Sequence, residues 1–178
     1  MTVVTRTTRE TRIRVEIARE GESTIATTVP FLDHMLVTLS RYSGIAMNVS
    51  AEGDLRHHVI EDTAISIGQA IAAFAPANCA RYADRTIPMD DALVHCALDV
   101  GGRPYYRGPL PSAVYDHWMR SFADNARATV HLRVLRGRGR HHIVEAAFKA
   151  LGLALRDATS ETGAVFSTKG AVELEVRR

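Results

Sequence analysis

Two copies of one short segment contain most of the side chains in this chain that could bind a metal ion. Residues 57–61 read His-His-Val-Ile-Glu, and residues 141–145 read His-His-Ile-Val-Glu. An Asp-His pair precedes each copy, at residues 33–34 and 116–117, and its histidine lies 23 residues before the first copy and 24 before the second. Six of the eight histidines therefore belong to one repeated pattern. Imidazole combined with carboxylate suits borderline divalent ions such as Mn, Fe, Co, Ni or Zn. The pattern predicts metal chemistry built on an internal duplication.

Each His-His-x-x-Glu segment is followed by apolar residues at helical spacing, so we expect it to begin a helix. Residues four apart share a helix face, so His57 and Glu61 can bind one ion together, as can His141 and Glu145. The second histidine of each segment points about 100° away and is expected to serve a different ion. This predicts two ions per chain, with ligands from both repeats or from neighbouring subunits. The alternative is two helix N-termini rich in His and Glu, which explains the glutamates but not the other matched positions.

Composition narrows the class of protein only moderately. A chain of 178 residues with net charge +2 suits one soluble domain or two small packed halves, and this charge does not indicate nucleic acid. Four arginines within residues 133–140 lie in a glycine-containing loop that could bind phosphate, contact RNA or be a solvated turn. Cys79 and Cys96 form neither a disulfide framework nor a zinc motif. Without a signal core or a membrane-spanning segment, we expect a cytoplasmic protein with no membrane or nucleic-acid partner.

Hydrophobic periodicity predicts the same order of elements in both halves of the chain. In the first half we expect strands at 12–18, 23–29 and 45–51 and helices at 31–42 and 57–74. In the second half we expect strands at 91–100, 103–107 and 128–135 and helices at 114–126 and 141–159. Each half is therefore a β-β-α-β-α unit. The fold class is α+β, a tandem duplication of repeats 1–90 and 91–178 fused into one compact unit, with helices packed on mixed sheets.

These motifs resemble those of the imidazoleglycerol-phosphate dehydratase family over nearly the whole chain. The segments that carry the resemblance are residues 9–11, 31–36, 57–61, 89–93, 102–105, 141–150 and 167–170. The resemblance implies a duplicated fold like domain 2 of ribosomal protein S5. It implies a metal-dependent carbon–oxygen lyase that dehydrates imidazole glycerol phosphate to imidazole acetol phosphate in histidine biosynthesis. It also implies two Mn²⁺ ions per subunit, no organic cofactor, and sites completed between subunits of a homo-oligomer of 24 chains.

The same resemblance assigns roles to individual residues. The implied metal ligands are His34, His57, His58, Glu61, His117, His141, His142 and Glu145. The implied phosphate-binding residues are Arg81, Arg103, Lys149, Ser167 and Lys169. Glu10 is the implied acid–base carboxylate, and Glu145 is counted beside it as a catalytic carboxylate. The alternative for each of the five phosphate-binding residues is a solvated side chain, and for Glu10 it is an exposed charge before a strand. His95 and His131 fit ordinary strand positions.

The chain departs from the family pattern at three loop positions. Between residues 53–55 and His57 there is only Arg56, where many members carry a longer stretch that ends in two aspartates. If those aspartates orient ligand imidazoles, another group must do so here. Gly139 stands where Asn is usual, and Phe166 stands where Pro is usual. These differences bear on loop geometry and substrate affinity, and they remove no ligand.

The expected mechanism avoids an unstabilised carbanion. Two metal ions stabilise the substrate ring as an imidazolate, loss of hydroxyl gives a diazafulvene-like intermediate, and Glu10 transfers protons. Two other classes of function compete with this one. A di-metal phosphate-ester hydrolase usually relies on bridging carboxylates, whereas this set has six imidazoles and two carboxylates. A metal-storage or metal-sensing protein leaves the phosphate-binding set unexplained.

Overall fold

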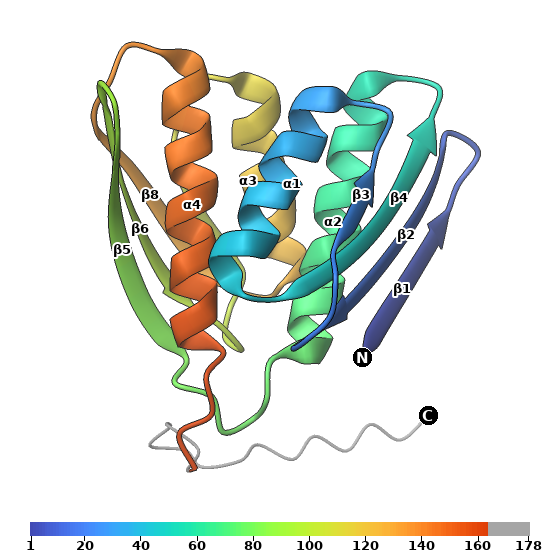
Figure 1. Ribbon diagram of the computed structural model, residues 1–178, viewed down its shortest axis with the longest axis horizontal. Helices are drawn as coiled ribbons and strands as arrows, with labels where there is room; N and C mark the ends of the chain where they lie inside the picture. The colour runs from blue at the N-terminus through green and yellow to red at the C-terminus, as the bar shows by residue number, and fades with distance from the viewer. Residues whose placement is uncertain (164–178) are drawn as a thin grey trace.

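The computed structural model describes residues 1–163, which form two four-stranded mixed sheets with four helices between them (Figure 1). The first half contains β1 (Thr2–Thr7), β2 (Thr11–Ala18), β3 (Thr24–Ala26), α1 (Pro30–Ser43), β4 (Ala46–Gly53) and α2 (Arg56–Phe74). The second half contains β5 (Tyr82–Met89), β6 (Ala92–Asp99), β7 (Tyr105–Arg107), α3 (Ala113–Asn125), β8 (Thr129–Arg136) and α4 (Arg140–Ala158).

The two sheets have matching topology. Their strand orders are β1-β2-β4-β3 and β5-β6-β8-β7, with one parallel pair in each, β3 with β4 and β7 with β8. The expected α+β tandem duplication is confirmed. Each unit has one strand more than we predicted, because β1 and β5 are edge strands with alternating half-exposed side chains and little apolar signal. The observed unit is therefore β-β-β-α-β-α. The repeat boundary at residues 90 and 91 stays a prediction; β5 pairs with β6 in the second sheet.

Alternation along the central strands directs one face of each sheet toward the helices. In β2, Ile13, Val15 and Ile17 are buried while the residues between them are exposed or half-buried, and β6 repeats this pattern. Because apolar residues alternate with polar ones, each sheet has one face in the core and one facing outward. The helices fill the space between these inner faces, with Trp118 and Phe148 among the largest fully buried side chains.

Helix packing joins the two halves. α1 packs against α4, and α2 packs against α3, so each helix contact pairs an element of one repeat with an element of the other. All four helices begin at the same end of the molecule (Figure 1). The N-terminal turns that carry the repeated histidines are therefore brought together at that end. Among the described residues, no helix has the length and apolar character needed to cross a membrane.

Candidate metal centres

The first group of potential ligands combines α1 with the start of α4. Nε2 of His34 and Nε2 of His141 lie 3.2 and 3.1 Å from the same oxygen, Oε2 of Glu145. His141 and Glu145 are four residues apart and share a helix face, as the sequence predicted. The possible ligand atoms of these three residues lie within 4.8 Å of one another, so they could hold one metal ion. We call this group the first triad.

The second triad is its counterpart, formed by His57, Glu61 and His117. Nε2 of His57 lies 3.4 Å from Oε2 of Glu61, and Nε2 of His117 lies 3.1 Å from Oε1 of the same carboxylate. The rings of the two histidines stack with their centroids 5.6 Å apart. Each triad thus takes a His-x-x-x-Glu pair from one repeat and a single histidine from the other. This arrangement follows from the packing of α1 on α4 and of α2 on α3.

The aspartate of each Asp-His pair fixes the helix that carries the histidine. Oδ1 of Asp33 accepts hydrogen bonds from N and Oγ1 of Thr27, at 2.8 and 2.6 Å. Oδ1 of Asp116 accepts hydrogen bonds from the Tyr106 hydroxyl at 2.6 Å and from the backbone N–H of Leu110 at 2.8 Å. In both repeats the backbone N–H donor lies six residues before the aspartate, whereas the hydroxyl donor is Thr27 in the first repeat and Tyr106 of β7 in the second.

The carboxylate of the first triad is buried and surrounded by donors. Glu145 is buried, and its Oε1 lies 3.0 Å from Nζ of Lys149. Burial raises the pKa of Glu145, but hydrogen bonds from Lys149 and His34 outweigh it, and the pKa is lowered. Glu145 is therefore ionised at neutral pH. The residue of α2 that corresponds to Lys149 is Ile65, so the second triad has no such lysine.

The second histidine of each segment lies outside the triads, on the side that faces a loop. Nδ1 of His58 lies 2.8 Å from Oδ1 of Asp54, and Nδ1 of His142 lies 2.8 Å from Oδ1 of Asp91. These hydrogen bonds raise the pKa of both histidines. A proton held at Nδ1 leaves the Nε2 lone pair for a ligand. Near the shortened loop, Asp54 is therefore the residue that contacts the imidazole of His58.

Asp91 also fixes the loop before α4. Its Oδ2 accepts hydrogen bonds from the backbone N–H groups of Arg138, at 2.6 Å, and Gly139, at 3.0 Å. The Gly139 bond, His142 and the Arg138 bond together hold the pKa of Asp91 well below its usual range. A Cβ atom on Gly139 would lie 3.2 Å from Nδ1 of His142, so the glycine leaves room for this contact.

The three predicted phosphate-binding residues that the structure describes, Arg81, Arg103 and Lys149, do not form one cluster within a chain. Arg81 pairs with Asp99 at 2.7 Å, and its backbone N–H donates to the carbonyl of Ala158 at the C-terminal end of α4. Arg103 lies nearby, where its carbonyl oxygen accepts a hydrogen bond from Thr129 at the start of β8. Lys149 lies one turn after Glu145 in α4, whereas Arg81 contacts the C-terminal end of that helix. Two further predicted residues, Ser167 and Lys169, lie outside the described residues.

The remaining predicted residues are Glu10, in the loop before β2, and the two histidines His95 in β6 and His131 in β8. Oε2 of Glu10 is 3.7 Å from Nδ1 of His58, and the Glu10 side chain is 57% exposed. His95 contacts Thr86 across two strands, with Nδ1 2.8 Å from its Oγ1. The His131 ring lies 5.4 Å from that of Tyr105. Neither of these two histidines contributes to a triad, as predicted for ordinary strand residues.

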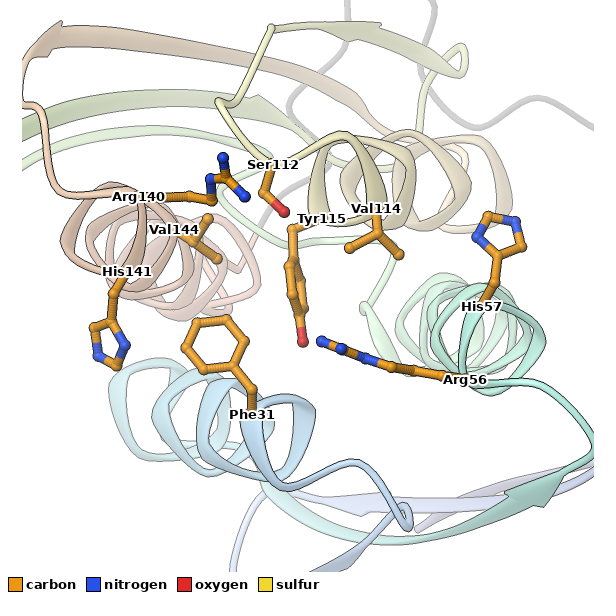
Figure 2. Close-up of a pocket in the computed structure, with 9 residues that line it drawn as sticks. All are labelled: Phe31, Arg56, His57, Ser112, Val114, Tyr115, Arg140, His141 and Val144. Carbon is orange, nitrogen blue, oxygen red and sulfur yellow. The ribbon is translucent and has the colours of Figure 1, made fainter.

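A cavity of about 610 Å³ separates the two triads (Figure 2). We call it the axial cavity, because matched residues of the two repeats line it on opposite sides. Its lining residues are Phe31, Arg56, His57, Ser112, Val114, Tyr115, Arg140, His141 and Val144. Periodicity could not reveal it, because it forms only where the N-terminal turns of all four helices meet.

Comparison with known proteins groups this chain with one set of relatives. The family model described as imidazoleglycerol-phosphate dehydratase matches residues 27–155. A relative of that name from Pyrobaculum calidifontis is 44% identical over an alignment of 184 positions. The alignment covers 94% of this chain and 98% of the relative. The crystal structure from Pyrococcus furiosus, in complex with (S)-C348, has a TM-score of 0.87 at 40% identity, covering 95% of this chain and 100% of that one. The structure from Staphylococcus aureus has a TM-score of 0.82 at 34% identity, covering 90% and 99% of the two chains.

Proposed function

We propose that this chain, which belongs to the imidazoleglycerol-phosphate dehydratase family, converts imidazole glycerol phosphate to imidazole acetol phosphate with the help of two divalent metal ions. The family resemblance found in the sequence is confirmed. The family catalyses the dehydration step of histidine biosynthesis, and the chain is accordingly a carbon–oxygen lyase. The number and identity of the ions and the roles of single residues are the parts that we add as proposals.

The observation that carries the metal proposal is the pair of triads. Each offers two imidazoles and one carboxylate, a set that suits Mn²⁺ and similar borderline ions. Nε2 of His117 is buried and makes no hydrogen bond of good geometry within the described residues, although Glu61 lies 3.1 Å away. A buried ring nitrogen with no such bond has no competing partner in the protein and could bind a metal ion. The residues therefore fit a divalent ion in each triad.

We extend the proposal to the assembly of the protein. The side chains of His57 and His141 are 56% and 55% exposed, so both triads open to the surface of the chain. His58 and His142 point away from these triads and would complete the coordination of ions held by neighbouring subunits. Arg81 and Arg103 lie at the opposite end of the helices from the triads, so they would bind the substrate phosphate at a site held by a different subunit. Both features support a homo-oligomer, for which we propose 24 subunits from the family resemblance.

The chain's own residues supply binding and proton transfer. A bound divalent ion supplies Lewis acidity, which favours negative charge on the imidazole ring of the substrate. We assign Glu145 to holding one ion, and this is its contribution to catalysis. Its Oε2 contacts both histidines of the first triad and its Oε1 contacts Lys149, so both oxygens are already engaged at the metal site. Glu10 is exposed beside His58 and is the carboxylate that we assign to proton transfer at the substrate. Lys149, together with Arg81, Arg103, Ser167 and Lys169, would hold the phosphate, because charge-assisted hydrogen bonds suit a dianion.

The test is to incubate the Mn-loaded protein with imidazole glycerol phosphate and to measure both ketone and inorganic phosphate. We expect ketone formation without phosphate release, and loss of turnover after chelation. Glu10→Gln should lower kcat at least about 100-fold, since general acid–base catalysis contributes about 10² to 10⁴, with the metal content unchanged. His131→Ala, a histidine outside the triads, is the matched control. Phosphate release would indicate a hydrolase, and metal binding without any turnover would indicate storage or sensing.

A further inference from the structure

The axial cavity carries cations and hydrogen-bond donors but is lined by no carboxylate. Arg56 and Arg140, the matched first residues of α2 and α4, lie on opposite sides of it (Figure 2). Within the part of the chain that the structure describes, neither guanidinium forms an ion pair with Asp or Glu. Two positive charges that face one cavity and form no ion pair of their own favour an anion between them.

A buried hydroxyl in the same cavity has no acceptor for its proton. Tyr115 is only 2% exposed, and among the described residues no acceptor lies in good geometry for its hydroxyl proton, while the Arg56 guanidinium approaches the hydroxyl oxygen as a donor. The nearest polar group in Figure 2 is the guanidinium of Arg56, which has only donors and cannot accept that proton. A buried donor without an acceptor is unfavourable, and an anionic oxygen would correct this.

The helix ends add to the positive potential. In none of the four helices does the side chain of the N-cap residue hydrogen-bond to the first turn. Helix N-termini carry partial positive charge and favour anions. The first-turn aspartates Asp33 and Asp116 do not line the cavity, and each uses one oxygen to accept bonds from the preceding loop.

We infer that the axial cavity is a binding site for a small oxyanion of the phosphate class, held between Arg56 and Arg140 with Tyr115 as a donor. The apolar side chains of Phe31 and Val144 line the same cavity and would shield the anion from water. This site goes beyond the proposed function, whose phosphate-binding set lies elsewhere. The oxyanion could be free phosphate or the phosphate end of a substrate molecule.

The test is calorimetric titration of inorganic phosphate into the full chain after chelation, because phosphate also binds Mn²⁺. We expect one phosphate per chain that depends on Arg56 and Arg140, apart from any phosphate bound by the Arg81 and Arg103 set. Arg56→Gln and Arg140→Gln should each weaken binding by about 10- to 100-fold, the range for hydrogen bonds to charged groups. Tyr115→Phe should weaken it about fivefold. Arg138→Gln removes the same charge two residues before Arg140, at a position that does not line the cavity, and should leave the affinity unchanged.

Three results would overturn the inference: no phosphate binding, equal affinity in the wild type and the Arg56→Gln/Arg140→Gln double variant, or a similar loss in Arg138→Gln. Because Tyr115→Phe removes one hydroxyl and no charge, it keeps the test valid if an arginine variant fails to fold. The source of the anion is then read from kinetics of the Mn-loaded enzyme. If phosphate inhibits competitively with substrate and the double variant loses this inhibition, the site binds the phosphate of the substrate. If the inhibition is non-competitive, the site binds a free anion. Absence of turnover would affect the proposed function and not this titration.

Discussion

Lys149 makes the two triads chemically unequal. Its Nζ lies 3.0 Å from Oε1 of Glu145, whereas the matched position in α2 is Ile65. A lysine one turn from the site both occupies a carboxylate oxygen and repels a cation. The two ions should therefore bind with different affinities, the weaker one in the first triad.

Exchanging these residues tests the difference. Lys149→Met should tighten the weaker metal site by on the order of tenfold, because it removes one nearby positive charge. Ile65→Lys should weaken the other site by a similar factor. Both values come from titration of the chelated protein with Mn²⁺. An unchanged pair of affinities in both variants would show that Lys149 does not act on the ion.

Asp54 is the second residue whose role is testable. Because it holds Nδ1 of His58, Asp54→Asn should weaken metal binding at that histidine by about 10- to 100-fold, the usual effect of removing a partner of a metal ligand. Asp124→Asn, an exposed aspartate near the end of α3, serves as the control. Calorimetry with Mn²⁺ gives the affinity, and circular dichroism checks the fold. Equal affinities in the two variants would contradict an orienting role.

At the level of elements, two matched glycines set the distance between helices. Gly68 and Gly152 each lie 11 residues after the first histidine of their segment. A Cβ atom on Gly68 would lie 2.7 Å from the carbonyl oxygen of Phe122 in α3. A Cβ atom on Gly152 would lie 2.8 Å from Cβ of Tyr42 in α1. The close approach brings His117 and His34 to the opposite helices.

Gly68→Ala and Gly152→Ala should therefore each lower the free energy of unfolding by about 1–3 kcal/mol, the cost of overpacking. In an exposed helix the same change would stabilise the protein by about 0.8–1 kcal/mol. The sign of the change in unfolding free energy therefore shows whether the two helices approach too closely for a Cβ atom. Denaturant unfolding of the chelated protein gives both values. Gln69→Ala, at the adjacent exposed position of α2, should change stability by less than about 0.5 kcal/mol.

The elements that the sequence predicted well are those with a buried stripe. β2, β6 and the four helices alternate or repeat apolar residues with a clear period, so they were expected near their observed bounds. The strands β1 and β5 were missed because none of their side chains is fully buried, so their sequences carry little apolar alternation.

The site was predictable only as far as local spacing extends. The i, i+4 pairs followed from helix geometry, and the exchange of histidines between repeats was one of two options left open. The axial cavity and the partners of Asp91 depend on contacts between segments far apart in the chain. No local period encodes such contacts.

At the level of the whole molecule, the exposed triads lead us to expect that metal and assembly are coupled. If ions join neighbouring subunits, chelation should break a large particle into smaller oligomers, and trimers are the species that we expect from the family resemblance. Adding Mn²⁺ back should restore the particle. Light scattering before and after chelation measures this. A particle of unchanged mass after complete removal of metal would contradict metal sites shared between subunits.

The exchange of histidines between repeats also bears on how such a chain can be divided. Each unit carries one His-x-x-x-Glu pair and the single histidine that belongs to the other unit's pair. A gene cut between Phe74 and Tyr82 would give two polypeptides, neither of which holds a complete triad. Co-expression should restore both triads through the contacts of α1 with α4 and α2 with α3. By the same geometry, a single unit could form both triads only as a homodimer, so this chain can be viewed as a covalently fused dimer.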